Sequence, residues 1–97
     1  MRKGYWIVAY RSAKDAEKLA RYIELAAPVF ERNGARFVAR GVPARVYEAG
    51  VAERTVVIEF ESVAKAIEVY ESADYQKAVA ALGDGAERDL RVLEAFE

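Results

Sequence analysis

The sequence contains no cysteine and no histidine. Without cysteine, the chain forms no disulfide, zinc–thiolate site or thiol nucleophile. Without histidine, it has no Ser-His-Asp triad, no imidazole acid–base catalyst and no imidazole ligand for haem, zinc or iron. These two absences exclude the commonest catalytic and metal-binding side chains, and we expect neither a metal nor another cofactor.

A strong charge of one sign and a long apolar run are also missing. The chain has 15 basic and 16 acidic residues, which leaves a net charge of -1. Nucleic acid and anionic membranes are therefore poor candidates as partners. The apolar run near the N-terminus spans only about seven residues, too short for a signal peptide or a membrane span. By default, we expect a cytoplasmic protein.

The chain is long enough for one domain, expected over residues 1–97. Its composition, 54% hydrophobic and 32% charged, is that of a globular protein. A domain of this size buries only roughly 60–65% of the surface that its unfolded chain exposes. A second surface buried against a partner would therefore add stability.

Hydrophobic spacing predicts alternating strands and helices. Runs of β-branched and aromatic residues predict strands over residues 4–11, 35–40, 54–61 and 89–96. Helical spacing predicts helices over residues 15–32, 62–71 and 73–82, the last two capped by Ser62 and Ser72. The order β-α-β-β-α-β, with a split second helix, indicates an α+β ferredoxin-like fold: a four-stranded antiparallel sheet with helices on one face.

Two prolines predict irregularities. Pro28 removes a backbone donor inside the first helix, so a kink or break is expected near residues 24–28. Pro43 follows Gly41 and Val42 and interrupts the second strand. Residues 44–48 are expected to continue that strand after a bulge.

Both faces of the first strand are apolar. Side chains along a strand point alternately to its two faces. One face therefore carries Tyr5, Ile7 and Ala9, and the other carries Trp6, Val8 and Tyr10. The helices of one chain cover only one face of the sheet. We therefore expect a homodimer that buries the open face, although a few exposed apolar residues are also normal for a monomer.

Four segments, in order, resemble a known family: GYWIV at 4–8, residues 27–41 with the motif GARFVARG, VVIEFES at 56–62 and YESADYQ at 70–76. Together they resemble the domain of unknown function 1330 family, in the dimeric α+β barrel superfamily. The resemblance implies that two chains pack sheet against sheet, and that a cleft lies between sheet and helices. It implies no established activity. Some superfamily members use a histidine as base or haem ligand, which this chain lacks.

Charged residues on the strands are the first candidates for a site. Glu59 lies inside an apolar strand, where an unpaired, buried carboxylate would have a raised pKa and act as a general base. The alternatives are an ion pair with Arg36 or Arg40 and a solvated position at the edge of the sheet. The two arginines lie four apart, so we expect them to share a face and to hold a carboxylate ligand or to pair with an acid such as Glu48.

Tyrosines are the second set of candidates. Four could offer a hydroxyl to a ligand, namely Tyr10, Tyr22, Tyr70 and Tyr75, although tyrosines at such spacing are more often core residues. Tyr10 and Tyr75 are the candidates for ligand contact. Three functions remain open: a dimer that binds a small organic molecule in each cleft, a cofactor-independent monooxygenase or isomerase, and a purely structural dimer.

Overall fold

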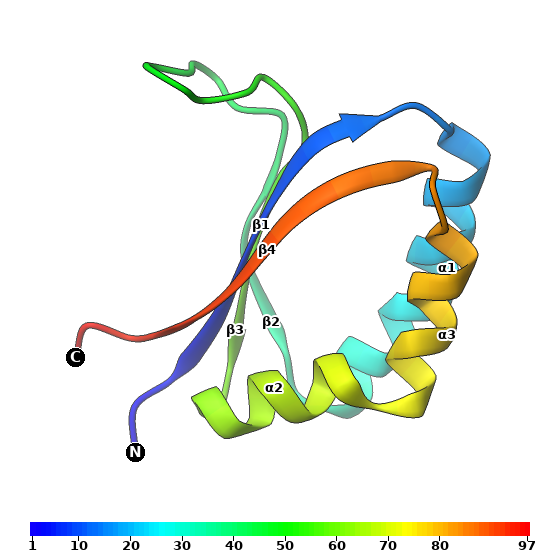
Figure 1. Cartoon of the computed structure of the whole chain (residues 1–97). Helices are drawn as coiled ribbons and strands as arrows, with labels where there is room; N and C mark the ends of the chain where they lie inside the picture. The colour runs from blue at the N-terminus through cyan, green and yellow to red at the C-terminus, as the bar shows by residue number, and fades with distance from the viewer.

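A computed structural model describes all residues, 1–97. Its elements are β1 (Gly4–Ala13), α1 (Ala16–Arg32), β2 (Arg36–Gly41), β3 (Thr55–Phe60), α2 (Val63–Glu71), α3 (Ala73–Leu82) and β4 (Ala86–Glu94). The strands form one antiparallel sheet in the order β2-β3-β1-β4, and all three helices lie on one side of it (Figure 1). The predicted ferredoxin-like α+β fold is confirmed.

Short polar side chains begin each helix. Asp15 caps α1, because its carboxylate accepts the backbone N–H groups of the next turn at 3.1 Å. The hydroxyls of Ser62 and Ser72 accept N–H groups of α2 and α3 at 3.0 and 3.2 Å. These caps satisfy donors that a helix leaves unpaired, which confirms the two serine caps expected from the sequence.

The structure departs from two local expectations. No break occurs near residues 24–28, because helix α1 is continuous through Pro28. Pro28 and Glu24 are both exposed, so water can hydrogen-bond the Glu24 carbonyl that the proline leaves without a partner. Residues 44–48 form no strand, because β2 ends at Gly41 with φ 149° and Pro43 has no N–H to donate to a neighbouring strand. They lie in a loop over residues 42–54.

Strand β4 begins earlier than the sequence predicts. Its pairing with β1 extends to Ala13 and Ala86, three residues before the predicted start at Asp89. The carbonyl of Gly85 accepts the backbone N–H groups of Lys14 and Asp15, which holds the two chain segments together beyond the strand ends. The polar sequence at the start of β4 concealed this extension.

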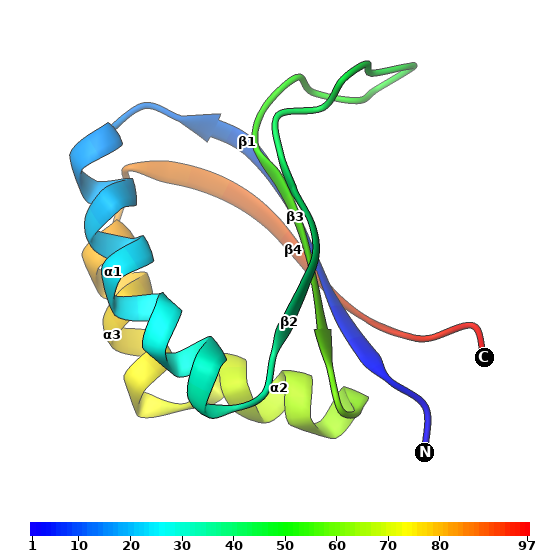
Figure 2. The ribbon, with the colours of Figure 1, turned by 180° about the vertical axis from the view of Figure 1, so that it is seen from behind.

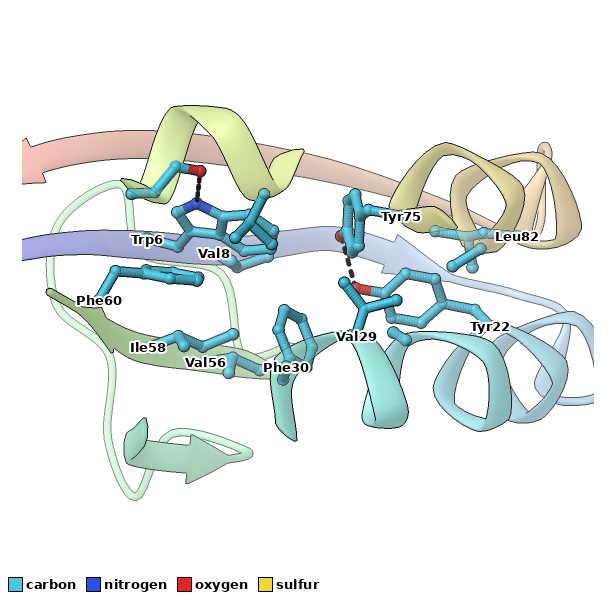
Figure 3. Packing of buried hydrophobic residues seen from close by; sticks show 14 of the residues in the cluster. Trp6, Val8, Tyr22, Val29, Phe30, Val56, Ile58, Phe60, Tyr75 and Leu82 are labelled. Atoms are coloured by element: carbon cyan, nitrogen blue, oxygen red, sulfur yellow. Dashed lines mark hydrogen bonds between the residues drawn. The ribbon is translucent and has the colours of Figure 1, made fainter. Parts of the chain in front are cut away.

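The core lies between the inner face of the sheet and the helices, and Trp6 is at its centre. The indole is fully buried, and its Nε1 donates to the carbonyl of Ala66 on α2 at 2.9 Å. The rings of Phe60 and Tyr75 lie with centroids 5.0 Å from the indole, and that of Phe30 at 5.5 Å (Figure 3). Aromatic packing therefore ties β1 to all three helices.

The outer face of the sheet carries no helix. Its side chains are half-buried and mixed in character, with Tyr5, Ile7, Ala9 and Val57 beside charged residues. The chain exposes 6427 Å². A compact monomer of this mass would expose about 5500 Å². The chain therefore exposes more surface than a compact monomer of its mass would.

The loop over residues 42–54 projects away from the sheet at the end opposite α2 (Figure 2). It presents large apolar side chains to solvent, namely Val42, Val46, Tyr47 and Val51. No helix of the chain is both long and apolar enough to cross a membrane.

Candidate functional site

A cleft opens between the inner face of the sheet and helix α1. Its apolar wall includes Trp6, Val8, Phe30, Val56 and Ile58. Its polar side chains are Tyr10, Tyr22, Arg40, Arg54 and Arg88. The volume of the cleft is about 70 Å³.

The register of the strands explains where the polar groups gather. Side chains on the inner face form three rows across β4, β1 and β3: Val92–Trp6–Ile58, Leu90–Val8–Val56 and Arg88–Tyr10–Arg54. The first two rows are wholly apolar and the third is wholly polar. The cleft therefore changes from apolar to cationic along the strands, towards the end at which Tyr10 lies.

Two guanidinium groups flank the ring of Tyr10 in the polar row. The central carbons of Arg54 and Arg88 lie 5.9 and 5.8 Å from its centroid. Arg40 lies on the same side of the sheet, 4.7 Å above the ring of Phe37. Cation–π contacts of this kind hold an arginine in place without neutralising its charge.

Arg88 also joins a pair of buried tyrosines. The hydroxyls of Tyr22 and Tyr75 lie 2.6 Å apart, and Arg88 Nη1 donates to them at 3.1 and 3.2 Å. Burial raises the pKa of both tyrosines, so both hydroxyls are protonated at neutral pH. Only one of the two protons is needed for the bond between them. The other has no acceptor within the chain.

The arginines of the cleft have no acidic partner. Neither Arg40, Arg54 nor Arg88 forms a salt bridge, whereas Arg36, Arg32 and Arg91 do. The Nε of Arg54 is buried and has no hydrogen-bond partner. An unpaired buried donor on a charged group costs free energy.

Glu59 lies outside this cleft. Its carboxylate is on the outer face, where it accepts hydrogen bonds from Arg36 Nε at 3.3 Å and from the Tyr5 hydroxyl at 3.0 Å. These bonds, led by those from Arg36, hold the pKa of Glu59 below its usual value. Of the alternatives that the sequence left open for Glu59, the structure has the ion pair with Arg36.

The prediction that Arg36 and Arg40 share a face is wrong. Arg36 pairs with Glu59 across the strands, but Arg40 pairs with Val56, which points to the core side. The cause is a bulge at Val38, which shifts the register by one residue and reverses the face of every later side chain. Arg40 therefore lines the cleft and Arg36 does not.

The other candidates divide between cleft and core. Tyr10 lines the cleft, and its hydroxyl makes no hydrogen bond within the chain although the residue is only 3% exposed. Tyr75 is fully buried and reaches the cleft through its bonds with Tyr22 and Arg88. Sequence reasoning missed Arg54 and Arg88. Arg88 lies in β4 and Arg54 directly precedes β3, and the neighbours two residues away from each are apolar. That alternation was the available signal.

No group of three or more acidic side chains is arranged to hold a metal ion. The chemistry of the cleft is instead that of hydrogen-bond donors beside an aromatic wall. Its side chains include no carboxylate and no amide.

Solved structures resemble the chain over nearly its whole length. A protein of unknown function from Rhodopseudomonas palustris has 22% identity and a TM-score of 0.74, over 99% of this chain and 84% of that one. SnoaB, a cofactor-independent oxygenase from Streptomyces nogalater, has 15% identity and a TM-score of 0.62, over 100% and 96% of the two chains. A dimeric ferredoxin-like protein of unknown function from Thermobifida fusca has 12% identity and a TM-score of 0.63, over 97% and 92%.

At such identities the likeness concerns the fold alone. No curated protein is detectably similar in sequence. The family model of DUF1330, a domain of unknown function, matches residues 3–96. The chain therefore belongs to the DUF1330 family.

Proposed function

We propose that the protein is a homodimer in which each subunit binds a small organic molecule in the cleft between the sheet and α1. The observation that carries this proposal is the cleft itself, an apolar wall bordered by three arginines, Arg40, Arg54 and Arg88, that form no salt bridge. Binding sites are typically concave, mostly apolar and furnished with a few convergent polar groups. The cleft has each of these properties.

Binding without turnover fits the cleft better than an enzymatic reaction. Proton abstraction needs a general base with a pKa near neutrality and within reach of the substrate. The cleft contains no carboxylate, the chain contains no histidine, and the pKa of the Tyr22 hydroxyl is raised. Glu59, the carboxylate that the sequence offered as a base, lies on the other face of the sheet with a lowered pKa.

The dimer is proposed from the outer face of the sheet. A standard interface covers about 800 Å² of each partner. The surface in excess of a compact monomer is of about that size. Two structural relatives, from Bacteroides fragilis and Thermobifida fusca, are described as dimeric proteins with this fold.

A thermal-shift screen of organic acids, phenols and quinones tests the binding proposal. A ligand that binds only the folded protein raises its melting temperature. We expect shifts for the wild type and for Glu59→Gln, but not for Ala27→Trp, which fills the mouth of the cleft from an exposed position on α1. Ala20→Trp, exposed on the same helix outside the cleft, is the matched control. No shift with any compound would refute the proposal.

Light scattering after size-exclusion chromatography tests the dimer. We expect a dimer mass for the wild type and a monomer mass for Ile7→Glu, which places a charge in the centre of the outer face. Ile67→Glu, on the exposed side of α2, should remain dimeric. A wild type that is monomeric at micromolar concentration would contradict the proposal.

A further inference from the structure

We infer that the ligand of the cleft is an organic monocarboxylic acid, whose carboxylate binds at the row Arg88–Tyr10–Arg54 and whose apolar body points towards Trp6. This inference rests on the proposed function and adds the chemical class and the orientation of the ligand. Three independent features of the cleft support it.

The first feature is charge. Three guanidinium groups border the cleft, none of them forms a salt bridge, and no acidic side chain lines it. The planar fork of an arginine matches the two oxygens of a carboxylate. An organic anion would therefore supply the charge that the chain itself does not place there.

The second feature is the hydrogen-bond inventory. Nε of Arg54, the hydroxyl of Tyr10 and one proton of the Tyr22–Tyr75 pair have no partner within the chain. Arg88 uses only Nη1 in its bonds to the tyrosines. These groups are donors, so they call for a ligand end made of acceptors, as a carboxylate is.

The third feature is the division of the cleft along the strands. The polar row borders an apolar row, and beyond it lies the row that contains Trp6 and Ile58. A ligand with its charge at Tyr10 therefore places the rest of its atoms against aliphatic and aromatic carbon. A carboxylate carries a single charge, whereas a phosphate dianion carries two. Placing the carboxylate beside an apolar wall therefore costs less hydration free energy.

Size limits the apolar body. The volume of the cleft, about 70 Å³, is about half that of a 150 Å³ cavity that accommodates benzene in another protein. A single ring or a short chain fits, if part of it lies in the wider mouth between α1 and the sheet.

Calorimetric titration with benzoate, and with benzamide as its neutral isostere, tests the inference. We expect the wild type to bind benzoate at least about tenfold more tightly than benzamide, because hydrogen bonds to a charged group are the stronger ones. Arg54→Met should lower the affinity for benzoate at least about tenfold and leave that for benzamide unchanged. Tyr10→Phe removes a hydroxyl that has no hydrogen-bond partner within the chain, and it should lower the affinity for benzoate several-fold. Arg45→Met, in the projecting loop, should change neither.

Hexanoate and inorganic phosphate complete the test. Binding of hexanoate or benzoate that Arg54→Met weakens supports the inference. Equal binding of benzoate and benzamide, both blocked by Ala27→Trp, would overturn the carboxylate assignment and leave the proposed function standing. Phosphate binding as tight as that of benzoate would overturn the role of the apolar wall. If neither acid binds at millimolar concentration, the carboxylate class is wrong. A screen without any hit, or hits that persist in Ala27→Trp, would refute the cleft as a binding site.

Discussion

Arg54→Met should make the ligand-free protein more stable while it impairs binding. Arg54 carries a buried Nε without a hydrogen-bond partner, a situation that costs about 1–3 kcal/mol. Methionine keeps most of the aliphatic stem and its packing, and it removes the charge. It also removes the cation–π contact with Tyr10, worth about 0.5–1 kcal/mol.

The two effects leave a net gain of about 1 kcal/mol in the free energy of unfolding. For a domain of this length, that gain raises the melting temperature by about 4–8 °C. Scanning calorimetry at one fixed protein concentration measures this gain, because the stability of the proposed dimer would depend on concentration. Arg45→Met is the matched control, since Arg45 is exposed and forms no salt bridge.

The result distinguishes a binding residue from a structural one. A residue kept for function at a cost in stability gives a variant that is more stable and binds less well. If Arg54→Met lowers the melting temperature by several degrees, Arg54 supports the fold and the reasoning fails. An equal gain in Arg45→Met would show that the effect is one of net charge and not of the buried donor.

Three further predictions concern the fold. Trp6→Ala should lower the free energy of unfolding by about 3–5 kcal/mol in urea denaturation, because it empties the centre of the core, and a loss below about 1 kcal/mol would contradict that position. Gly4→Ala should lower the melting temperature, because a Cβ there would lie 2.6 Å from the backbone of Ser62; a variant as stable as the wild type would refute this close approach. The pKa of Glu59 is lower in the folded protein than its usual value of 4.5. The ionised Glu59 therefore stabilises the fold above pH 4.5, and this stabilisation is lost as the pH falls through the pKa of the folded state. The wild type should therefore lose more stability than Glu59→Gln when acidified below about pH 5, and parallel curves would contradict the ion pair.

The sequence predicts the elements well because each has a local signal. Capping serines and apolar spacing locate the helices, and runs of β-branched residues locate β1 and β3. The bulge at Val38 has no such signal, since an extra residue in a strand is defined only by its partner. For that reason the sequence could not place Arg40 in the cleft and Arg36 outside it.

The site itself depends on register. Tyr10 was a candidate from its residue type, but Arg54 and Arg88 become its neighbours only when β3 and β4 pair with β1 on either side. Glu59 was a candidate because a carboxylate interrupts an apolar strand, and the pairing with Arg36 explains it without a catalytic role. Residue type identified chemically capable groups, whereas strand pairing decided which of them meet.

The central claim is that an organic acid binds in the cleft through Arg54 and Arg88. NMR of the arginine side-chain Nε–H groups, titrated with benzoate, tests it directly, because each arginine gives its own signal and Arg54→Met assigns one of them. The account predicts that the signals of Arg54 and Arg88 shift on saturation, while that of Arg36, held by Glu59 on the outer face, does not. An unchanged Arg54 signal in a protein that binds benzoate would contradict the claim.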